Sequence, residues 1–149
     1  MVQRNFIVGI LFGFSVLLIS GQVFAQSDVE KRQALMKSNG ADAKAIKAAV
    51  DAKDYATVET KAKDISGNAE KIVSLFPKGS NTGKTKATAA IWEKPDEFAK
   101  AAKNMGKAAS ELAAAAKSGN EGEVGVKFKA LGDACASCHK AFRAEKYAE

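Results

Sequence analysis

The stretch Cys135-Ala136-Ser137-Cys138-His139 lies close to the end of the 149-residue chain and is its most informative segment. It sits inside a run whose apolar residues, from Val124 to Phe142, recur every three or four positions, which predicts one face of a helix. On a helix, side chains three and four positions apart project from the same side. Cys135, Cys138 and His139 therefore form one constellation on a C-terminal helix.

The order of these residues is typical of covalent haem attachment. Two thiols add across the vinyl groups of the porphyrin, while the imidazole that follows them binds iron from the proximal side. We therefore predict one covalently bound haem c, held by Cys135 and Cys138, with His139 as an axial ligand of the iron.

Three other uses of the motif leave part of it unexplained. A structural zinc ion needs four ligands, whereas the chain has two cysteines and one histidine. A thioredoxin-like dithiol belongs in a βαβ setting, and the sequence has no such pattern. A Cys135–Cys138 disulfide in a helical module without haem is the remaining alternative, but it gives His139 no role.

The rest of the chain has the composition of an all-α protein. Alanine and lysine are abundant, aromatic residues make up 7% of the chain, and there are only two prolines. Apolar residues fall on one helical face in four segments, which predicts helices over residues 28–50, 54–76, 95–118 and 124–147. Asp28 is expected to cap the first helix, the second is expected to start near Asp54, and the third is expected to begin at Pro95-Asp96.

The lengths of the links predict how these helices are arranged. The first and second helices, and the third and fourth, are joined by short links, which favours antiparallel neighbours. The link over residues 77–94 is long and polar, and it ends in Ile91-Trp92. We therefore predict an antiparallel four-helix bundle with a long loop between helices two and three, and with Trp92 and Phe98 closing the core at the loop end.

The first 25 residues are expected to be a signal peptide rather than part of the fold. Arg4 precedes an apolar stretch from Phe6 to Ile19, and Val23-Phe24-Ala25 fits the small-residue rule before a cleavage site. A membrane anchor is the alternative, but the apolar stretch is short for a span. We predict cleavage after Ala25, export to the periplasm without a stable membrane anchor, and one domain over residues 26–149.

The charge of the chain indicates what kind of partner it meets. The formal net charge is +6, which favours acidic partners or surfaces. The lysines are scattered among acidic residues without interleaved aromatic residues, which argues against a nucleic-acid-binding surface.

Beyond the motif, the chain resembles the class II cytochromes c, the family of cytochromes c′ and their methionine-ligated low-spin relatives of the cytochrome c-556 type. The resemblance rests on four stretches and covers the whole of residues 26–149. A haem motif near the C-terminus, preceded by three helices, distinguishes this family from small cytochromes that carry the motif near the N-terminus. The four stretches are residues 32–37, Leu75-Phe76-Pro77, Ala90-Ile91-Trp92 with Phe98, and residues 135–143.

The resemblance implies roles for further residues. Cys135 and Cys138 form the thioethers and His139 is axial, while Arg32 and Arg143 fall where arginines of the family approach the haem propionates. A guanidinium suits that task through charge-assisted hydrogen bonds. Members of the family occur as monomers and as homodimers, and either state is compatible with this sequence.

The sixth position of the iron decides between two functions. His139 is the only histidine, so bis-histidine ligation is excluded within one subunit, and Met36 and Met105 are the candidate methionines. In the low-spin branch of the family, the methionine at the place of Met36 binds iron. In cytochromes c′, the residue at that place packs over an open iron face. Met105 is expected to fill the core instead.

If Met36 binds the iron, the protein is expected to be an outer-sphere electron carrier and not an enzyme. Its redox partners would be acidic periplasmic proteins, which Lys140, Arg143 and Lys146 beside the haem edge would attract. The alternative is a five-coordinate haem that binds nitric oxide or carbon monoxide in a gas-buffering or sensing role.

Overall fold

The computed structural model describes residues 27–146, and almost all of its regular structure is helical. The expected signal peptide, residues 1–25, lies outside these residues. In chain order the elements are α1 (Asp28–Asp51), α2 (Tyr55–Ile72), the 3₁₀ helix η1 (Val73–Leu75), α3 (Ala90–Glu93), α4 (Pro95–Ser118) and α5 (Glu121–Phe142). Within residues 27–146 there is no strand, and the only β-type pairing is an isolated bridge between Ala87 and Arg143.

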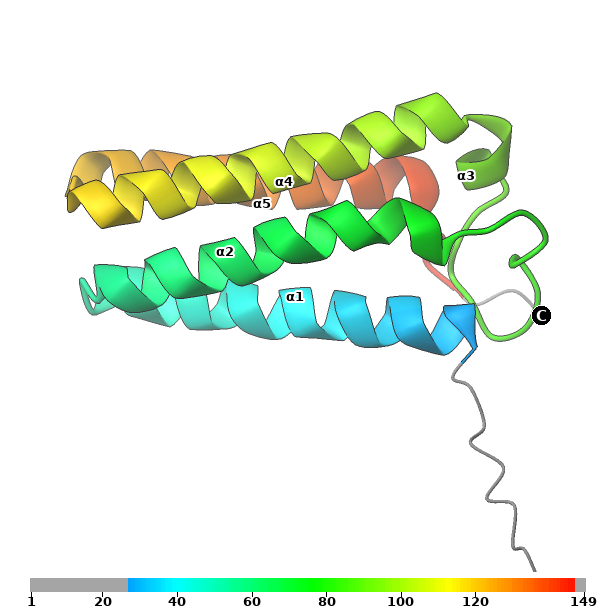
Figure 1. Ribbon diagram of the computed structural model, residues 1–149, viewed down its shortest axis with the longest axis horizontal. Helices are drawn as coiled ribbons and strands as arrows, with labels where there is room; N and C mark the ends of the chain where they lie inside the picture. The colour runs from blue at the N-terminus through cyan, green and yellow to red at the C-terminus, as the bar shows by residue number, and fades with distance from the viewer. Residues whose placement is uncertain (1–26, 147–149) are drawn as a thin grey trace, which may run out of the picture.

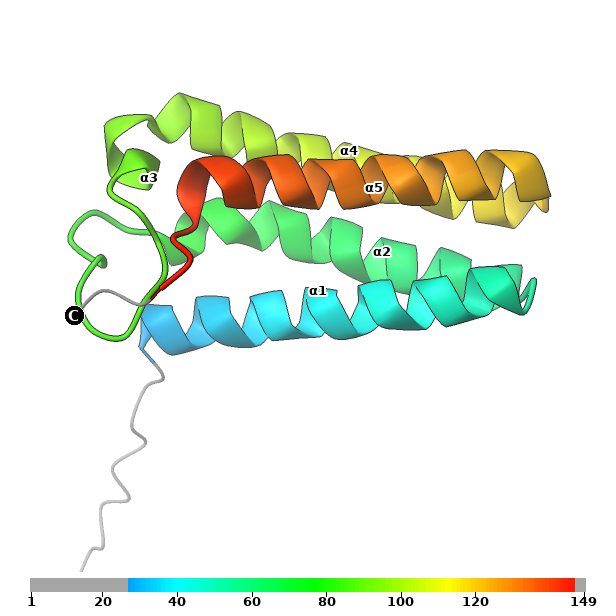
Figure 2. The same ribbon diagram turned by 180° about the vertical axis from the view of Figure 1, so that it is seen from behind.

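The four long helices lie side by side as an antiparallel bundle, as predicted (Figure 1). α1 packs on α2, α2 on α4 and α4 on α5, whereas α1 and α5 contact each other very little. Seen from behind, the connection from α2 to α4 crosses the end of the bundle where α1 begins and α5 ends (Figure 2). This arrangement brings the start of the first helix, the long loop and the C-terminal motif to one end.

The helix starts follow the capping residues, with one correction. The residue that caps α1 is Ser27 and not Asp28, because Ser27 accepts from the backbone N–H of Glu30 while the Glu30 carboxylate accepts from the N–H of Ser27. Asp28 instead lies in the first turn, where its charge favours the helix N-terminus. Asp54, near which the second helix was expected to start, caps α2, and Pro95, where the third helix was expected to begin, is the first residue of α4.

Three stretches differ from the sequence-based prediction. α5 ends at Phe142, not near Tyr147, because Arg143 turns to extended backbone and pairs with Ala87 of the loop. The last turn predicted for the second helix is the 3₁₀ helix Val73–Leu75. The short helix Ala90–Glu93 was expected to be loop, because one turn leaves too few positions for a periodic pattern.

The core is built from small and branched side chains of all four long helices. Ile46, Val58, Leu112 and Val124 are fully buried. At the loop end Trp92 donates its Nε1–H to the carbonyl oxygens of Phe76 and Pro77, at 3.2 and 2.9 Å, and Phe98 is 4% exposed. Trp92 and Phe98 thus close the loop end of the core, as predicted. No helix among residues 27–146 is long and apolar enough to cross a membrane.

Two glycines at the α4–α5 corner predict opposite effects of the same substitution. Gly119 ends α4 in the left-handed region at φ 71°, where a Cβ is strained, although nothing lies within 4 Å of that position. Gly119→Ala should therefore lower the free energy of unfolding by about 1 kcal/mol. Gly125 lies inside α5, also with open space around it, so Gly125→Ala should raise that free energy by about 0.5–1 kcal/mol. Urea unfolding of both variants tests this pair; equal changes would contradict it.

Candidate haem site

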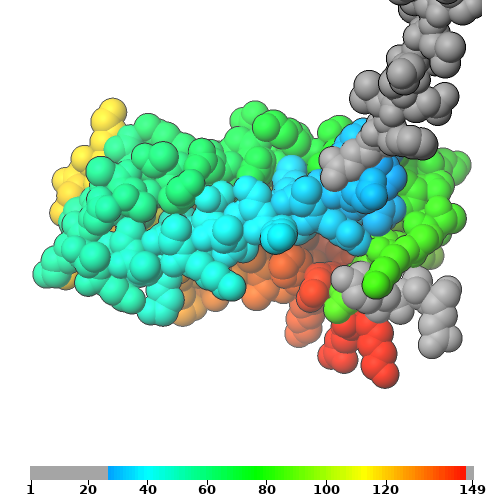
Figure 3. Space-filling view, turned by 90° about the horizontal axis from the view of Figure 1, so that it is seen from below, coloured from blue at the N-terminus to red at the C-terminus, as the bar shows by residue number. Residues whose placement is uncertain are grey.

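A cavity of about 490 Å³ lies at the loop end of the bundle, in the gap that α1 and α5 leave between them. Seen from the α1 side, the end of α5 (red) emerges next to the loop (green) at this end (Figure 3). The lining comes from α1, the loop, α3, α4 and the end of α5. It consists of Arg32, Gln33, Met36, Lys37, Phe76, Thr85, Lys86, Ala87, Ile91, Phe98, Cys138, His139, Phe142 and Arg143.

The C-terminal motif forms one wall of this cavity. Cys138 and His139 line it, and Cys135, one turn earlier on α5, is half-buried and packs against the core. The two cysteines are not joined to each other, and burial raises the pKa of both thiols. Partial burial and the neighbouring Arg143 lower the pKa of His139, which favours the neutral imidazole, the form that binds a metal.

The two methionines occupy different environments. Met36 on α1 is half-buried and lines the same cavity as Cys138 and His139. Met105 on α4 is 6% exposed, lies in the hydrophobic core and is not among the residues that line the cavity. Met105 therefore fills the core, as expected, and Met36 is the methionine that shares a cavity with the histidine.

The two arginines differ in what they contact. Arg32 is 3% exposed, and its guanidinium donates to Ser80 and Thr85 of the loop and lies 4.7 Å from the centre of the Phe76 ring. Burial lowers the pKa of Arg32. Arg143 is exposed at the cavity mouth, just after α5. Both arginines border the cavity, but only Arg32 is held by the loop through its side chain.

The floor of the cavity is aromatic. Phe98 of α4 packs edge-on against Phe76, with ring centroids 4.9 Å apart, and against Phe142 of α5 at 5.2 Å. Offset and edge-to-face pairs at such separations are favourable. The three rings join η1, α4 and α5 beneath the motif, so the floor is a rigid apolar surface.

The lining fits a haem on two counts. A porphyrin presents a flat apolar ring, which matches the aromatic floor of Phe76, Phe98 and Phe142 together with the apolar side chain of Ile91. It also carries two carboxylates, and the lining contains four cationic side chains and no acidic one: Arg32, Lys37, Lys86 and Arg143. By contrast, no group of three His, Cys, Asp or Glu side chains gathers as a metal site among residues 27–146.

Several lining residues were not identified from the sequence. Thr85, Lys86 and Ala87 belong to the loop, where no periodic pattern marks the side that faces inward, and Lys37 reads as an ordinary surface lysine. Phe142 was placed on the apolar face of the last helix, and that periodicity was the one available signal for it.

Comparisons with known proteins agree with this site. The family model described as cytochrome C′ matches residues 27–143. A cytochrome c′ of Rhodospirillum rubrum is 32% identical over 96% of this chain and 99% of its own, and a cytochrome c-556 of Agrobacterium fabrum is 34% identical over 96% of this chain and 97% of its own.

A solved structure has the same fold. The cytochrome c′ of Thermochromatium tepidum superimposes with a TM-score of 0.74 and 28% sequence identity, covering 79% of this chain and 95% of its own. Residues 27–143, which the family model matches, contain the whole bundle and the C-terminal motif. The chain therefore belongs to the cytochrome c′ family, the class II cytochromes c, and is a four-helix-bundle protein of one covalent haem c.

Proposed function

We propose that this protein is an outer-sphere electron carrier in which Cys135 and Cys138 hold the haem and His139 and Met36 are the two axial ligands of its iron. The observation that supports the proposal is that Met36 of α1 and His139 of α5, far apart in the sequence, border one cavity. A bound haem supplies reversible one-electron exchange between ferric and ferrous iron.

The surroundings of the two axial residues suit this role. If His139 and Met36 both bound the iron, no coordination position would remain for a substrate, so catalysis is not expected. A methionine as the second ligand would also favour the ferrous state relative to two histidines. The apolar floor offers the porphyrin ring a surface without hydrogen-bonding side chains. Arg143, and the two guanidinium N–H groups of Arg32 that are not bonded to the loop, would be suited to bind the propionates.

The proposal includes export of the chain. Residues 1–25 have the features of a signal peptide that is removed after Ala25, and covalent haem attachment suits a periplasmic protein. The mature protein would then be the single domain of residues 26–149.

A five-coordinate haem that binds nitric oxide or carbon monoxide is the second candidate function. Two observations favour it: the family description and the R. rubrum relative are cytochromes c′, and Met36 is only half-buried beside an apolar cavity. In that case the methionine would pack over an open iron face. Such a face would take neutral diatomic gases in preference to anions.

One set of visible spectra separates the two functions. The holoprotein is recorded ferric and ferrous at neutral pH, and the ferrous form again under carbon monoxide. Low-spin spectra that carbon monoxide leaves unchanged would support the electron carrier. High-spin spectra and rapid formation of a carbonyl adduct would refute ligation by Met36 and support the gas-binding function. A purified protein without haem absorption would refute both.

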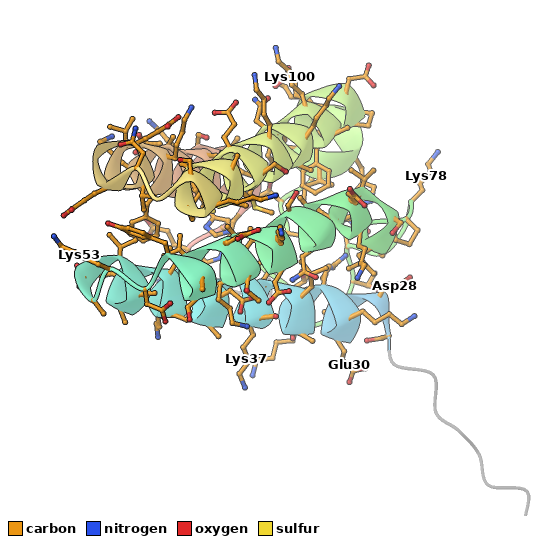
Figure 4. All side chains as sticks on the ribbon, turned by 60° about the vertical axis from the view of Figure 1, so that its left-hand side comes forward. Asp28, Glu30, Lys37, Lys53, Lys78 and Lys100 are labelled. Atoms are coloured by element: carbon orange, nitrogen blue, oxygen red, sulfur yellow. The ribbon has the colours of Figure 1, made fainter. Side chains whose placement is uncertain are left out.

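An acidic redox partner is expected to recognise the cavity end of the molecule. Lys140, Arg143 and Lys146 lie at the end of α5, and Lys37 extends from α1 away from the bundle (Figure 4). Electron exchange with an acidic partner should slow by about tenfold between low and high salt, because screening removes electrostatic steering. Lys140→Glu should slow it at low salt, whereas Lys117→Glu, an exposed position in the last turn of α4 at the other end of the bundle, should not. Equal effects of the two variants would contradict docking at this end.

A further inference from the structure

Residues 80–88 of the loop, called the strap below, connect the two helices that face each other across the cavity. On the α1 side, Arg32 makes three hydrogen bonds to the strap. Its Nη1 donates to Ser80 Oγ at 3.1 Å, and its Nη2 donates to the Ser80 carbonyl oxygen at 2.7 Å and to Thr85 Oγ1 at 3.0 Å. The next side chain, Gln33, donates to the Lys84 carbonyl oxygen at 2.8 Å.

On the α5 side, the strap is held by two backbone hydrogen bonds and by the Lys86 side chain, whose Nζ donates to the Glu145 carbonyl oxygen at 2.6 Å. The Thr88 N–H donates to the carbonyl oxygen of Phe142 at 3.1 Å, and the Ala144 N–H donates to that of Lys86 at 2.8 Å. Together these two bonds flank the bridge between Ala87 and Arg143. The strap is thus attached to the chain immediately after the motif helix.

The strap is the main connection between α1 and α5 at this end. The two helices contact each other far less than the other neighbouring pairs of the bundle do, because the cavity lies between them. Thr85, Lys86 and Ala87 of the strap close the cavity where the helices stay apart. The spacing of the two helices here therefore depends on the hydrogen bonds at each end of the strap.

Arg32 is a buried cation, which is a costly residue to use if its only task is to hold the strap in place. It is 3% exposed, and the partners of its guanidinium hydrogen bonds are all uncharged. Burying a cation without a directly hydrogen-bonded carboxylate is costly, so the hydrogen bonds have to compensate. Only an arginine provides a planar fork with five N–H donors, and three of these reach the strap while two are left for another acceptor.

We propose that Arg32 is a positioning residue: through the strap it sets the separation of α1 from α5 and thereby holds Met36 within reach of the iron. The inference rests on the proposed electron-carrier function, because that function makes Met36 the sixth ligand of the iron. Met36 lies one turn after Arg32 on α1, and His139 of α5 lies four residues before Arg143, which follows the helix and pairs with Ala87. Each axial residue thus lies four residues along the chain from an attachment point of the strap.

The test compares three variants of the holoprotein. Arg32→Lys keeps the positive charge but loses the fork, and Thr85→Val keeps Arg32 and removes one of its three acceptors with little change in shape. Lys31→Gln is the matched control, because Lys31 is an exposed neighbour on α1 whose ion pair is with Asp28 of its own helix. The readouts are hydrogen exchange of the Thr88 and Ala144 amides, whose hydrogen bonds join the strap to the segment after the motif, and the carbon monoxide association rate of the ferrous form.

Arg32→Lys and Thr85→Val should each speed amide exchange and carbon monoxide association about tenfold or more, because each loses a hydrogen bond to a charged group. Lys31→Gln should change neither. If Arg32→Lys exchanged its amides and bound carbon monoxide at the wild-type rates, the proposal would be overturned, because a positive charge alone would then be enough to hold the strap. Faster exchange with unchanged carbon monoxide binding would also overturn it, because the strap would then not position Met36.

The two proposals fail in different ways. Rapid carbon monoxide binding by the wild-type protein would refute ligation by Met36, and with it the claim that Arg32 positions that residue. A wild-type protein that resists carbon monoxide, together with an Arg32→Lys variant that also resists it, would leave the electron-carrier function standing and refute the role of Arg32 alone.

Discussion

The Met36→Ala protein is expected to change from a low-spin to a high-spin haem protein that binds carbon monoxide. Alanine removes the thioether that lies in the same cavity as His139, so the sixth position becomes open to a gas. Carbon monoxide should then bind at least tenfold more tightly, a difference of about 1.4 kcal/mol. Visible spectra of the ferrous protein, titrated with carbon monoxide, measure both the spin state and the affinity.

Met105→Leu is the matched control for this result. Met105 is the other methionine of the bundle, but it lies in the core of α4 away from the cavity lining. Its replacement by leucine keeps the volume and should leave the spectra and the carbon monoxide affinity unchanged. A Met36→Ala protein whose spectra stayed low-spin would contradict the assignment of Met36 as the sixth ligand.

The Phe98→Ala protein is expected to lose about 3–5 kcal/mol of its free energy of unfolding, the range for truncating a buried phenylalanine. Phe98 is 4% exposed and is the central ring between Phe76 and Phe142. Its removal leaves a void under the cavity and ends two edge-on ring contacts. Urea unfolding of the holoprotein, followed by circular dichroism, gives the difference.

Phe128→Ala provides the comparison. Phe128 is half-buried on α5, so its truncation should cost clearly less than that of Phe98. Phe98→Leu, which keeps most of the apolar volume, should also cost less than Phe98→Ala. A loss below about 1 kcal/mol for Phe98→Ala would mean that the site collapses easily, and the aromatic floor would not be rigid.

The helices were predictable because their signals are local. Periodic apolar residues located all four long helices, and Asp54 and Pro95 marked helix starts that the structure has at the same places. Where a predicted helix boundary was wrong, the error is one or a few residues, and a contact that the periodic pattern does not include sets the boundary. Ser27 rather than Asp28 caps α1 because of the reciprocal bonds with Glu30, and α5 stops at Phe142 because Arg143 pairs with Ala87.

The candidate site was predictable only on the side of the motif. Cys135, Cys138 and His139 are neighbours in sequence, and helical spacing alone brings them together. The contacts of Arg32 with Ser80 and Thr85 were not predictable, because residues of an irregular loop carry no pattern that records which helix they meet. The sequence identified Arg32 as a candidate, but not that the loop holds it.

The sequence by itself determined the fold class, the helix positions and the haem motif, since these depend on residues a few positions apart. Only the tertiary structure decided that Met36 and His139 border one cavity and that a strap joins the helices carrying them. These features depend on how α1 and α5 pack around the other helices. That packing reflects side-chain volumes and hydrogen bonds between distant segments, which no local pattern encodes.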